Sequence, residues 1–332
     1  MTVSTASLPN AQHLTTEAST LLTRLSDADP AVRRIALFEL ADLEDAALLP
    51  AFVAALRDDP APEVRREAAA VLASWENDEV VDALCAALLD ADGEVQLAAA
   101  QSLSELKEPS SGHVLRRWAA RPEPFVRRAA LRGLRELRFA QAFDPASLAL
   151  ADADADSGLR LEAVAVLGWL KDERALGPLA SLAASDANAD VRRACVGALG
   201  FASCDDQAIL DALLAALRDE TWQVREEAAT TLGKLRAAAA RAALVEALGD
   251  SYWQVRLRAA RALGKLRDAQ AAPAVAALLV HTISNLRKEA ALALGELGSH
   301  GSLPALQAAL DDRDPDVRKA VRIAIGQIEG SV

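Results

Sequence analysis

The sequence predicts an all-α fold, a right-handed α-solenoid of about ten two-helix repeats. A short motif recurs ten times along the 332 residues at nearly constant spacing, which is typical of repeat proteins. Within each copy, apolar residues lie four and eight positions after the first, and this spacing places them on one face of a helix. Hydrophobic residues make up 52% of the chain but aromatic residues only 4%. The apolar residues are mainly alanine and leucine, which favour helices over strands.

The motif is anchored by an aliphatic residue, followed by arginine in nine of ten copies. Successive anchors lie 31 to 33 residues apart. Because each repeat of a solenoid contacts only its neighbours, a constant period is what such an architecture requires. The anchors are Val32, Val64, Val95, Val126, Leu159, Val191, Val224, Val255, Leu286 and Val317.

Each copy predicts a first helix that starts near the anchor, a turn, and a second helix. A small residue four positions after the anchor lets a neighbouring helix approach closely, and a leucine or isoleucine eight positions after it fills the layer. The last six copies carry glycine at the ninth position. Apolar stretches that follow, such as residues 82–89, 209–217 and 304–310, are expected to form the second helices.

The expected array begins with a lone helix near residues 14–25, continues with nine helix pairs and closes with a tenth first helix at 317–328. We expect residues 13–332 to form a single solenoid and residues 1–12 to be extended or disordered. Such arcs offer a concave face to partners, and we expect the second helices to build it.

The start of each first helix carries a second pattern of charged residues. Aspartate stands five positions before the anchor in eight copies, and a capping residue (Asp, Asn or Thr) stands three positions before it in six. We expect these aspartates to cap the helix or to pair with the arginines, which would tie neighbouring repeats together. The exceptions are Gln96 in the arginine column and Arg121 and His281 in the aspartate column. For His281 we expect a substitute cap acceptor.

The pattern D-x(4)-V-R-x(3)-A-x(3)-L resembles the short HEAT-like repeats of phycobilin lyases and their relatives, over roughly residues 14–328. This resemblance implies a helical solenoid. Phycobilin lyases work as paired subunits that attach or remove a linear tetrapyrrole. The resemblance therefore implies, as an alternative function, a cofactor-handling or assembly factor with a lyase-like subunit activity.

Motifs for catalysis are lacking. The sequence has no phosphate-binding loop, no GxSxG and no HExxH. Di-iron hydroxylases that share this repeat type need His-Glu pairs, whereas Leu, Val, Thr and Gly follow the four histidines here. Cys195 replaces alanine in a core column, Cys85 stands among acidic residues and Cys204 lies in a turn. We therefore predict no enzyme activity, no catalytic residue, no metal and no cofactor.

The net charge of −12 argues against nucleic acid and against anionic membranes as partners. There is no secretory signal, no apolar run approaches the roughly 18 residues of a membrane helix, and the three cysteines form no disulfide or metal pattern. A cytoplasmic location is the expectation. The sequence leaves homo-oligomerisation open.

A basic cluster interrupts this acidic chain. Residues 113–140 contain eight arginines and two glutamates, whereas residues 67–106 contain nine acidic residues and no lysine or arginine. Two interpretations stay open. The two blocks neutralise each other, or the arginines bind an acidic or phosphorylated segment of a protein, because guanidinium groups bind carboxylate and phosphate bidentately. The candidate residues are Arg116, Arg117, Trp118, Arg121, Arg128, Arg132 and Arg135.

Aromatic residues form a second departure from the repeat. Trp222 and Trp253 occupy the position where four other copies carry proline, and Tyr252 precedes Trp253. Packing between repeats is the favoured interpretation, and anchoring of a partner is the alternative, because Trp, Tyr and Arg dominate interface hot spots. Trp75 and Trp169 are expected in the core.

Together these features predict a non-catalytic protein-binding scaffold that recognises its partner through the concave face.

Overall fold

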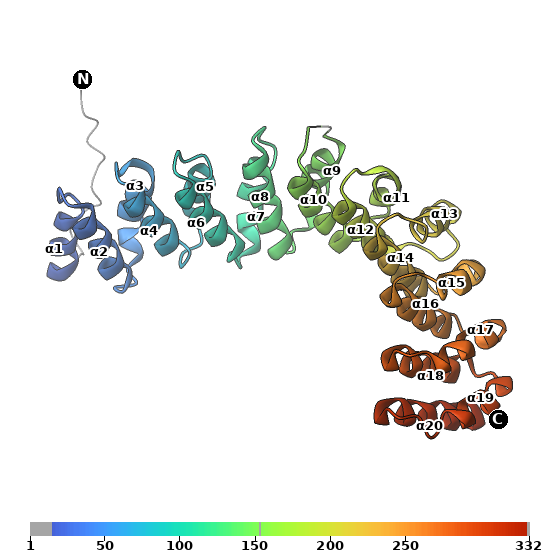
Figure 1. Cartoon of the computed structure of the whole chain (residues 1–332). Coiled ribbons are helices and arrows are strands. Elements are labelled where there is room, and N and C mark those ends of the chain that lie inside the picture. Colours follow the sequence, from blue (N-terminus) through green and yellow to red (C-terminus); the bar gives the residue numbers. More distant parts are fainter. Residues whose placement is uncertain (1–14, 153, 331–332) are drawn as a thin grey trace. The chain divides into compact units, whose positions relative to one another are not determined.

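The computed structural model describes residues 15–152 and 154–330, and within them the fold is all-α, with 20 α-helices joined by turns and short 3-10 segments (Figure 1). The predicted lone helix at the N-terminal end is α1 (Thr16–Arg24). Residues 1–12, expected to be extended or disordered, lie outside the described residues.

The remaining helices alternate as predicted between first and second helices of nine pairs, closed by a tenth first helix. The first helices are α2 (Pro30–Ala41), α4 (Pro62–Leu72), α6 (Gly93–Ser104), α8 (Pro124–Glu136), α10 (Ser157–Leu170), α12 (Ala189–Ala198), α14 (Trp222–Leu235), α16 (Trp253–Leu266), α18 (Ser284–Leu297) and α20 (Pro315–Glu329). The second helices are α3 (Leu49–Asp58), α5 (Asp78–Ala87), α7 (Gly112–Trp118), α9 (Phe143–Ala151), α11 (Leu176–Ser185), α13 (Gln207–Ala216), α15 (Arg241–Ala247), α17 (Ala272–Ala276) and α19 (Leu303–Ala308).

The chain divides into two compact units, Met1–Val166 and Leu167–Val332. Within each unit, first helices pack side by side in one layer, and most second helices pack against the first helix that follows them. The single cooperative solenoid stays a prediction.

The repeat columns form the core of both units. All ten residues four positions after an anchor have no exposed surface. Nine of the ten anchors and nine of the ten residues eight positions after them are also buried. The exceptions lie in the first and last repeats, where Val32 and Ile325 are half-buried. The α-helical spacing in the sequence therefore predicted the core correctly.

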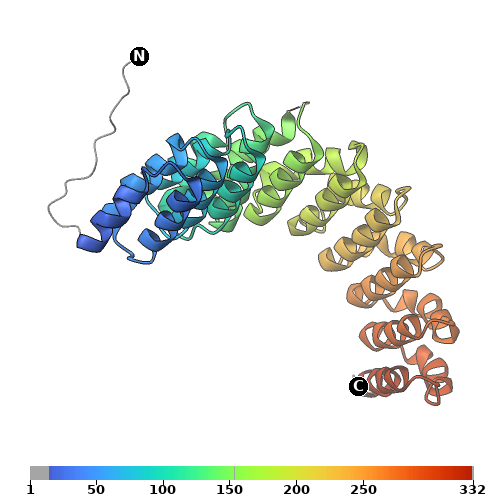
Figure 2. The ribbon, with the colours of Figure 1, turned by 60° about the vertical axis from the view of Figure 1, so that its left-hand side comes forward.

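Glycine brings the first helices of Leu167–Val332 into backbone contact. A β-carbon placed on Gly233 would lie 2.8 Å from Cα of Ala262, and one on Gly295 would lie 2.9 Å from Cα of Ala324. Non-bonded carbons do not approach this closely without strain. In this unit the first helices lie on the inner side of the curve and the second helices on the outer side (Figures 1 and 2). The expectation that second helices build the concave face is wrong here, because small residues shorten the first-helix layer.

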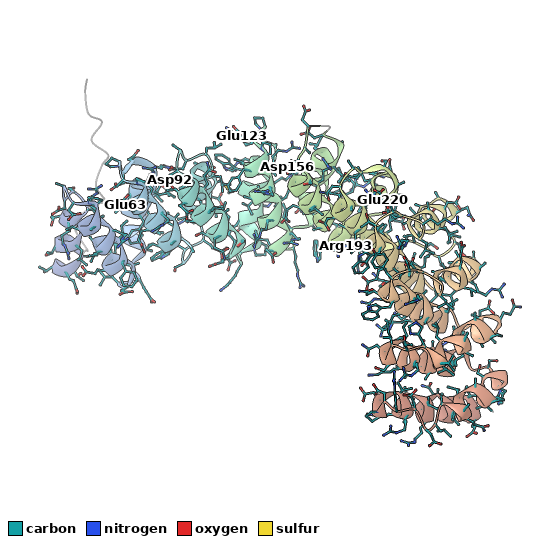
Figure 3. All side chains as sticks on the ribbon, in the orientation of Figure 1. Glu63, Asp92, Glu123, Asp156, Arg193 and Glu220 are labelled. Carbon is teal, nitrogen blue, oxygen red and sulfur yellow. The ribbon has the colours of Figure 1, made fainter. Side chains whose placement is uncertain are left out.

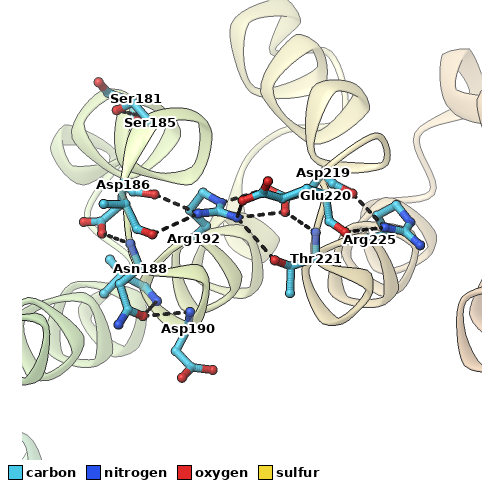
Figure 4. A network of polar contacts seen from close by, with 12 residues as sticks. Ser181, Ser185, Asp186, Asn188, Asp190, Arg192, Asp219, Glu220, Thr221 and Arg225 are labelled. Carbon is cyan, nitrogen blue, oxygen red and sulfur yellow. Dashed lines mark hydrogen bonds and ion pairs between the residues drawn. The ribbon is translucent and has the colours of Figure 1, made fainter.

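The predicted pairs of arginine and aspartate lie at the start of the first helices. We call the series of pairs the ladder and each pair a rung. In five rungs, Nε and Nη2 of an arginine donate to both carboxylate oxygens of the aspartate in the next repeat, at 2.6 to 3.0 Å. The same aspartate accepts the N–H two residues ahead, as Asp219 does from Thr221 at 2.8 Å. Arg192 and Arg225 belong to successive rungs of the second unit (Figure 4). The five pairs are Arg33–Asp59, Arg65–Asp90, Arg192–Asp219, Arg225–Asp250 and Arg287–Asp312.

Candidate functional site

Helix α8 carries the densest part of the basic cluster. Its residues Arg128, Arg132 and Arg135 are spaced four and three apart, so they share one side of the helix. We call this set the α8 arginine face. Arg127 is instead buried and forms a ladder rung with Asp152. Adjacent arginines of α8 therefore have different roles, one within the ladder and one on the surface.

The members of the α8 arginine face differ in their partners. Arg128 lies over the ring of Phe125, 5.4 Å from its centroid, and forms no ion pair with the described residues. Arg132 is exposed, and its side chain makes neither a hydrogen bond nor an ion pair within the described part of the chain. Arg135 donates to Glu136 at 2.9 Å and lies 3.8 Å from Glu162. Charge thus remains available mainly at Arg132 and Arg128.

The other predicted arginines belong to the second-helix layer or to the following turn. Arg116 lies 3.9 Å from Asp144 of α9, and Arg117 lies 3.6 Å from Asp82 of α5. The indole N–H of Trp118 donates to the same Asp82 carboxylate at 2.8 Å. These contacts link α7 to its neighbouring second helices. The predicted residues therefore divide between two layers of the unit.

Arg121 stands in the turn before α8. It donates twice to Glu123, at 2.9 and 3.1 Å, and lies over the Trp118 ring. Its hydrogen bond lowers the pKa of the Glu123 carboxyl. At this junction both ladder residues have changed, because Gln96 replaces the arginine and Arg121 replaces the aspartate. Gln96 keeps one contact of the lost arginine, a bond from its side-chain N–H to the carbonyl of Asp90 at 2.6 Å.

Mutual neutralisation of the acidic and basic blocks is limited to one residue. Among the described side chains, Asp82 is the member of the acidic block that contacts an arginine of residues 113–140. Glu76 instead accepts backbone N–H groups of Lys107 and Glu108. Glu63, Asp92, Glu123 and Asp156 lie along the edge where the first helices begin (Figure 3). The interpretation that the blocks cancel therefore explains Arg117 but not Arg132.

Exposed apolar residues occupy the same side of the first helices. Leu97 of α6 is 57% exposed, at the position two after the anchor that Arg128 occupies in the next repeat. On α2, Ile35 and Phe38 are 45% and 57% exposed. The sequence did not predict these three residues as part of the surface. Leu97 was detectable in principle, because the two preceding repeats carry arginine in its column.

The aromatic pair of the second unit packs between repeats, as the favoured interpretation held. Trp222 at the start of α14 stacks on Tyr252, with ring centroids 5.4 Å apart and planes 13° apart. The guanidinium group of Arg225 also lies over the Tyr252 ring, 5.7 Å from its centroid. Tyr252 nevertheless stays 45% exposed, whereas Trp253 is half-buried.

The two remaining tryptophans behave differently from each other. Trp75 is partly buried and packs against Phe52, with centroids 5.4 Å apart. Trp169 is 39% exposed in the last turn of α10, so the expectation that it belongs to the core is wrong. Trp169 lies two residues after Leu167, the buried leucine of this repeat, and close to the exposed end of α10.

The three cysteines differ in exposure. Cys85 and Cys195 are buried and Cys204 is exposed. Burial, together with the charge of Asp82, raises the pKa of the Cys85 thiol far above its usual value. Among residues 15–152 and 154–330, no three His, Cys, Asp or Glu side chains are grouped to hold a metal ion. A helix that could cross the bilayer is likewise not found in the described part of the chain.

Sequence comparison matches a model of HEAT repeats in overlapping segments, at residues 18–104, 49–135, 114–200, 178–257 and 242–326. This model describes HEAT repeats in general, so the phycobilin-lyase subtype stays a prediction. No curated protein sequence matches the chain significantly.

Solved structures show the same fold at low sequence identity. An engineered protein is 22% identical, with a TM-score of 0.55 over 95% of this chain and 99% of its own. Kap95p, solved with RanGDP, is 13% identical, with a TM-score of 0.66 over 94% of this chain and 49% of its own. The karyopherin Kap121p, bound to the extreme C-terminus of the phosphatase Cdc14p, is 14% identical, with a TM-score of 0.59 over 94% and 41%. The chain thus spans less than half the length of Kap95p and of Kap121p.

Proposed function

The chain belongs to the HEAT-repeat family, and on that basis we propose that it is a non-catalytic protein-binding scaffold. The proposed site is the first-helix surface of residues 15–166. It combines the exposed Leu97 of α6 with Arg128 and Arg132 of α8. The chemistry that fits this surface is a partner segment with carboxylate or phosphate groups next to an apolar side chain.

The observation that carries the proposal is the unpaired state of Arg132 in a chain of net charge −12. Acidic residues outnumber basic ones, and most arginines of the ladder are paired at 2.6 to 3.0 Å. Exposed ion pairs contribute little stability, so folding does not require the cation at Arg132. A cation and an exposed leucine on neighbouring helices instead suit recognition, since interfaces combine apolar contacts with arginine.

Relatives support a role in binding proteins. Kap121p is described in complex with the SUMO protease Ulp1p and with the end of Cdc14p. Those proteins are under 25% identical to this chain and are more than twice its matched length, so their partners are not transferred. What they contribute is a precedent for a HEAT solenoid that holds a segment of another protein.

Affinity capture with matched variants tests the proposal. The tagged wild-type chain is compared with Arg132→Glu, with Leu97→Ser and with the control Arg57→Glu, which reverses an exposed arginine of the second helix α3. A protein retained by wild type and by Arg57→Glu, but lost with the other two variants, is the expected result. Calorimetry with that purified partner should show a loss of about tenfold, or ~1.4 kcal/mol, for each substitution.

Circular dichroism establishes that each variant is folded. Equal capture by Arg132→Glu, Leu97→Ser and wild type would remove the basis for this site. A phosphatase treatment of the captured partner distinguishes phosphate groups from carboxylates.

A further inference from the structure

One rung of the ladder has lost its carboxylate but kept its arginine. Arg256 follows the anchor Val255, as the arginine does in every complete rung, yet His281 stands where the next repeat should supply aspartate. The side chain of Arg256 makes no hydrogen bond or ion pair with the described residues, and its Nε is buried without a partner. Burial of an unpaired guanidinium donor carries a free-energy cost. At the Gln96 junction, by contrast, both residues have changed and no such donor is left.

His281 keeps one role of the missing aspartate. Its Nδ1 accepts the N–H of Ile283 at 3.0 Å, the bond that an aspartate oxygen accepts in complete rungs. The expected substitution of a cap acceptor is therefore confirmed. Because Nδ1 is an acceptor, the proton of the neutral ring lies on Nε2, which is then a donor. The rung position thus holds a guanidinium and a ring N–H, and neither group can replace the carboxylate acceptor.

Gln254 carries the other buried atom without a partner on α16, its Oε1. Residues two apart on a helix do not face each other, so this acceptor does not satisfy Arg256.

The surroundings of His281 are open and partly apolar. Val280 is 89% exposed. A surface pocket of about 500 Å³ lies on the side of His281 that faces the next rung. Its lining is partly apolar, with Leu279, Ala305 and Ala308, and partly charged, with Arg287, Asp311, Asp312 and Arg313. Toward the preceding repeat, the edge carries the exposed Tyr252 of the aromatic stack. An extended segment can therefore approach along Val280 and His281, whereas the Nε of Arg256 lies below the surface.

We propose that Arg256 and His281 form a carboxylate-binding site, which an aspartate or glutamate side chain of a partner protein fills. The preference for carboxylate follows from the same chain, because five equivalent arginines hold aspartate bidentately. A partner carboxylate would complete the rung between α16 and α18, and Val280 and the adjacent pocket would contact its neighbouring residues. This site belongs to the second unit and does not depend on the α8 arginine face.

Nuclear magnetic resonance titration of the full chain tests the site. The probe is N-acetyl-aspartate N-methylamide, with the uncharged asparagine analogue and inorganic phosphate as separate arms. The aspartate probe should shift the Nε–H signal of Arg256 and the ring signals of His281, with a dissociation constant on the order of millimolar. The asparagine analogue should leave them unchanged.

Two variants distinguish the site from general charge effects. His281→Asp supplies the carboxylate internally, so it should abolish the probe-induced shifts and raise the melting temperature. Arg256→Gln should also abolish the response of His281 while the chain remains folded, since Arg256 joins no rung. Shifts that persist in His281→Asp would overturn the proposal, and so would a response to phosphate alone, which would assign a different ligand.

Discussion

Removal of one aspartate from the ladder should destabilise the second unit by several kcal/mol. Arg192 and Asp219 have side chains only 8% and 11% exposed, joined at 2.8 and 2.9 Å. Asp219→Ala leaves a nearly buried guanidinium and also removes the acceptor of the Thr221 N–H. Loss of one partner of a buried pair costs about 3–5 kcal/mol. Glu220 lies 3.5 Å from Arg192 and is 87% exposed, so it can compensate in part. We therefore expect the lower end, ~3 kcal/mol.

Urea unfolding followed by circular dichroism, with hydrogen exchange of α12 and α14, measures this cost. The control is Glu246→Ala, which breaks the Arg218–Glu246 pair at 3.5 Å with side chains 71% and 72% exposed. It should change stability by less than ~0.5 kcal/mol. Asp219→Asn keeps an oxygen for Thr221 and should fall between the two. Equal unfolding midpoints for Asp219→Ala and Glu246→Ala would refute the role assigned to the buried rungs.

Three further predictions concern packing, pH and thiol chemistry. Gly233→Ala should destabilise the chain by about 1–3 kcal/mol in urea titrations, because the new β-carbon would lie 2.8 Å from the next helix. Gly326→Ala, whose β-carbon would have nothing within 4 Å, should instead stabilise the chain by up to ~1 kcal/mol. The hydrogen bond from Arg287 lowers the pKa of the Asp312 carboxyl below its unfolded value of about 3.9, so the contribution of this rung is present above about pH 4 and declines as the pH falls further. Unfolding midpoints at pH 7, 5 and 3 should show that loss, and Asp312→Asn should reduce it. A maleimide should label the native chain once, at Cys204, as judged by mass spectrometry, because the other two thiols are buried; fast double labelling would contradict this.

Much of the fold could be predicted because ten copies of the repeat carry the same residue types at the same positions of the helix. The column that contains Ala228 was predicted correctly as buried. The aspartate column was predicted correctly to pair with arginine in five rungs, whereas in the fifth copy Arg127 pairs with Asp152 and not with the column residue Asp154. The helix layer that lies on the inner side of the curve in Leu167–Val332 was predicted wrongly. It depends on how closely the backbones of neighbouring helices approach at glycines such as Gly233, and the spacing of residues in the sequence does not give that distance.

The candidate site was predicted less completely. Composition located the arginines of α8, but it could not separate Arg127, a ladder residue, from Arg128, a surface residue one position later. The exposure of Leu97 depends on the face of α6 that the neighbouring helices leave uncovered. The unpaired state of Arg256 required a comparison across two repeats, since its missing partner lies 25 residues away at His281.

The glycine contacts of the first helices also have a mechanical consequence for Leu167–Val332. Where the backbones of neighbouring first helices are already in contact, these helices cannot move closer together, so the first-helix layer resists compression. The opposite layer contains the short helices α17 and α19, and its successive helices contact one another less than the first helices do. Bending then pivots about the first helices and is taken up by spreading or closing of the second. A ligand that wedges between second helices would flex the unit, whereas one lying along the first helices would meet a rigid surface.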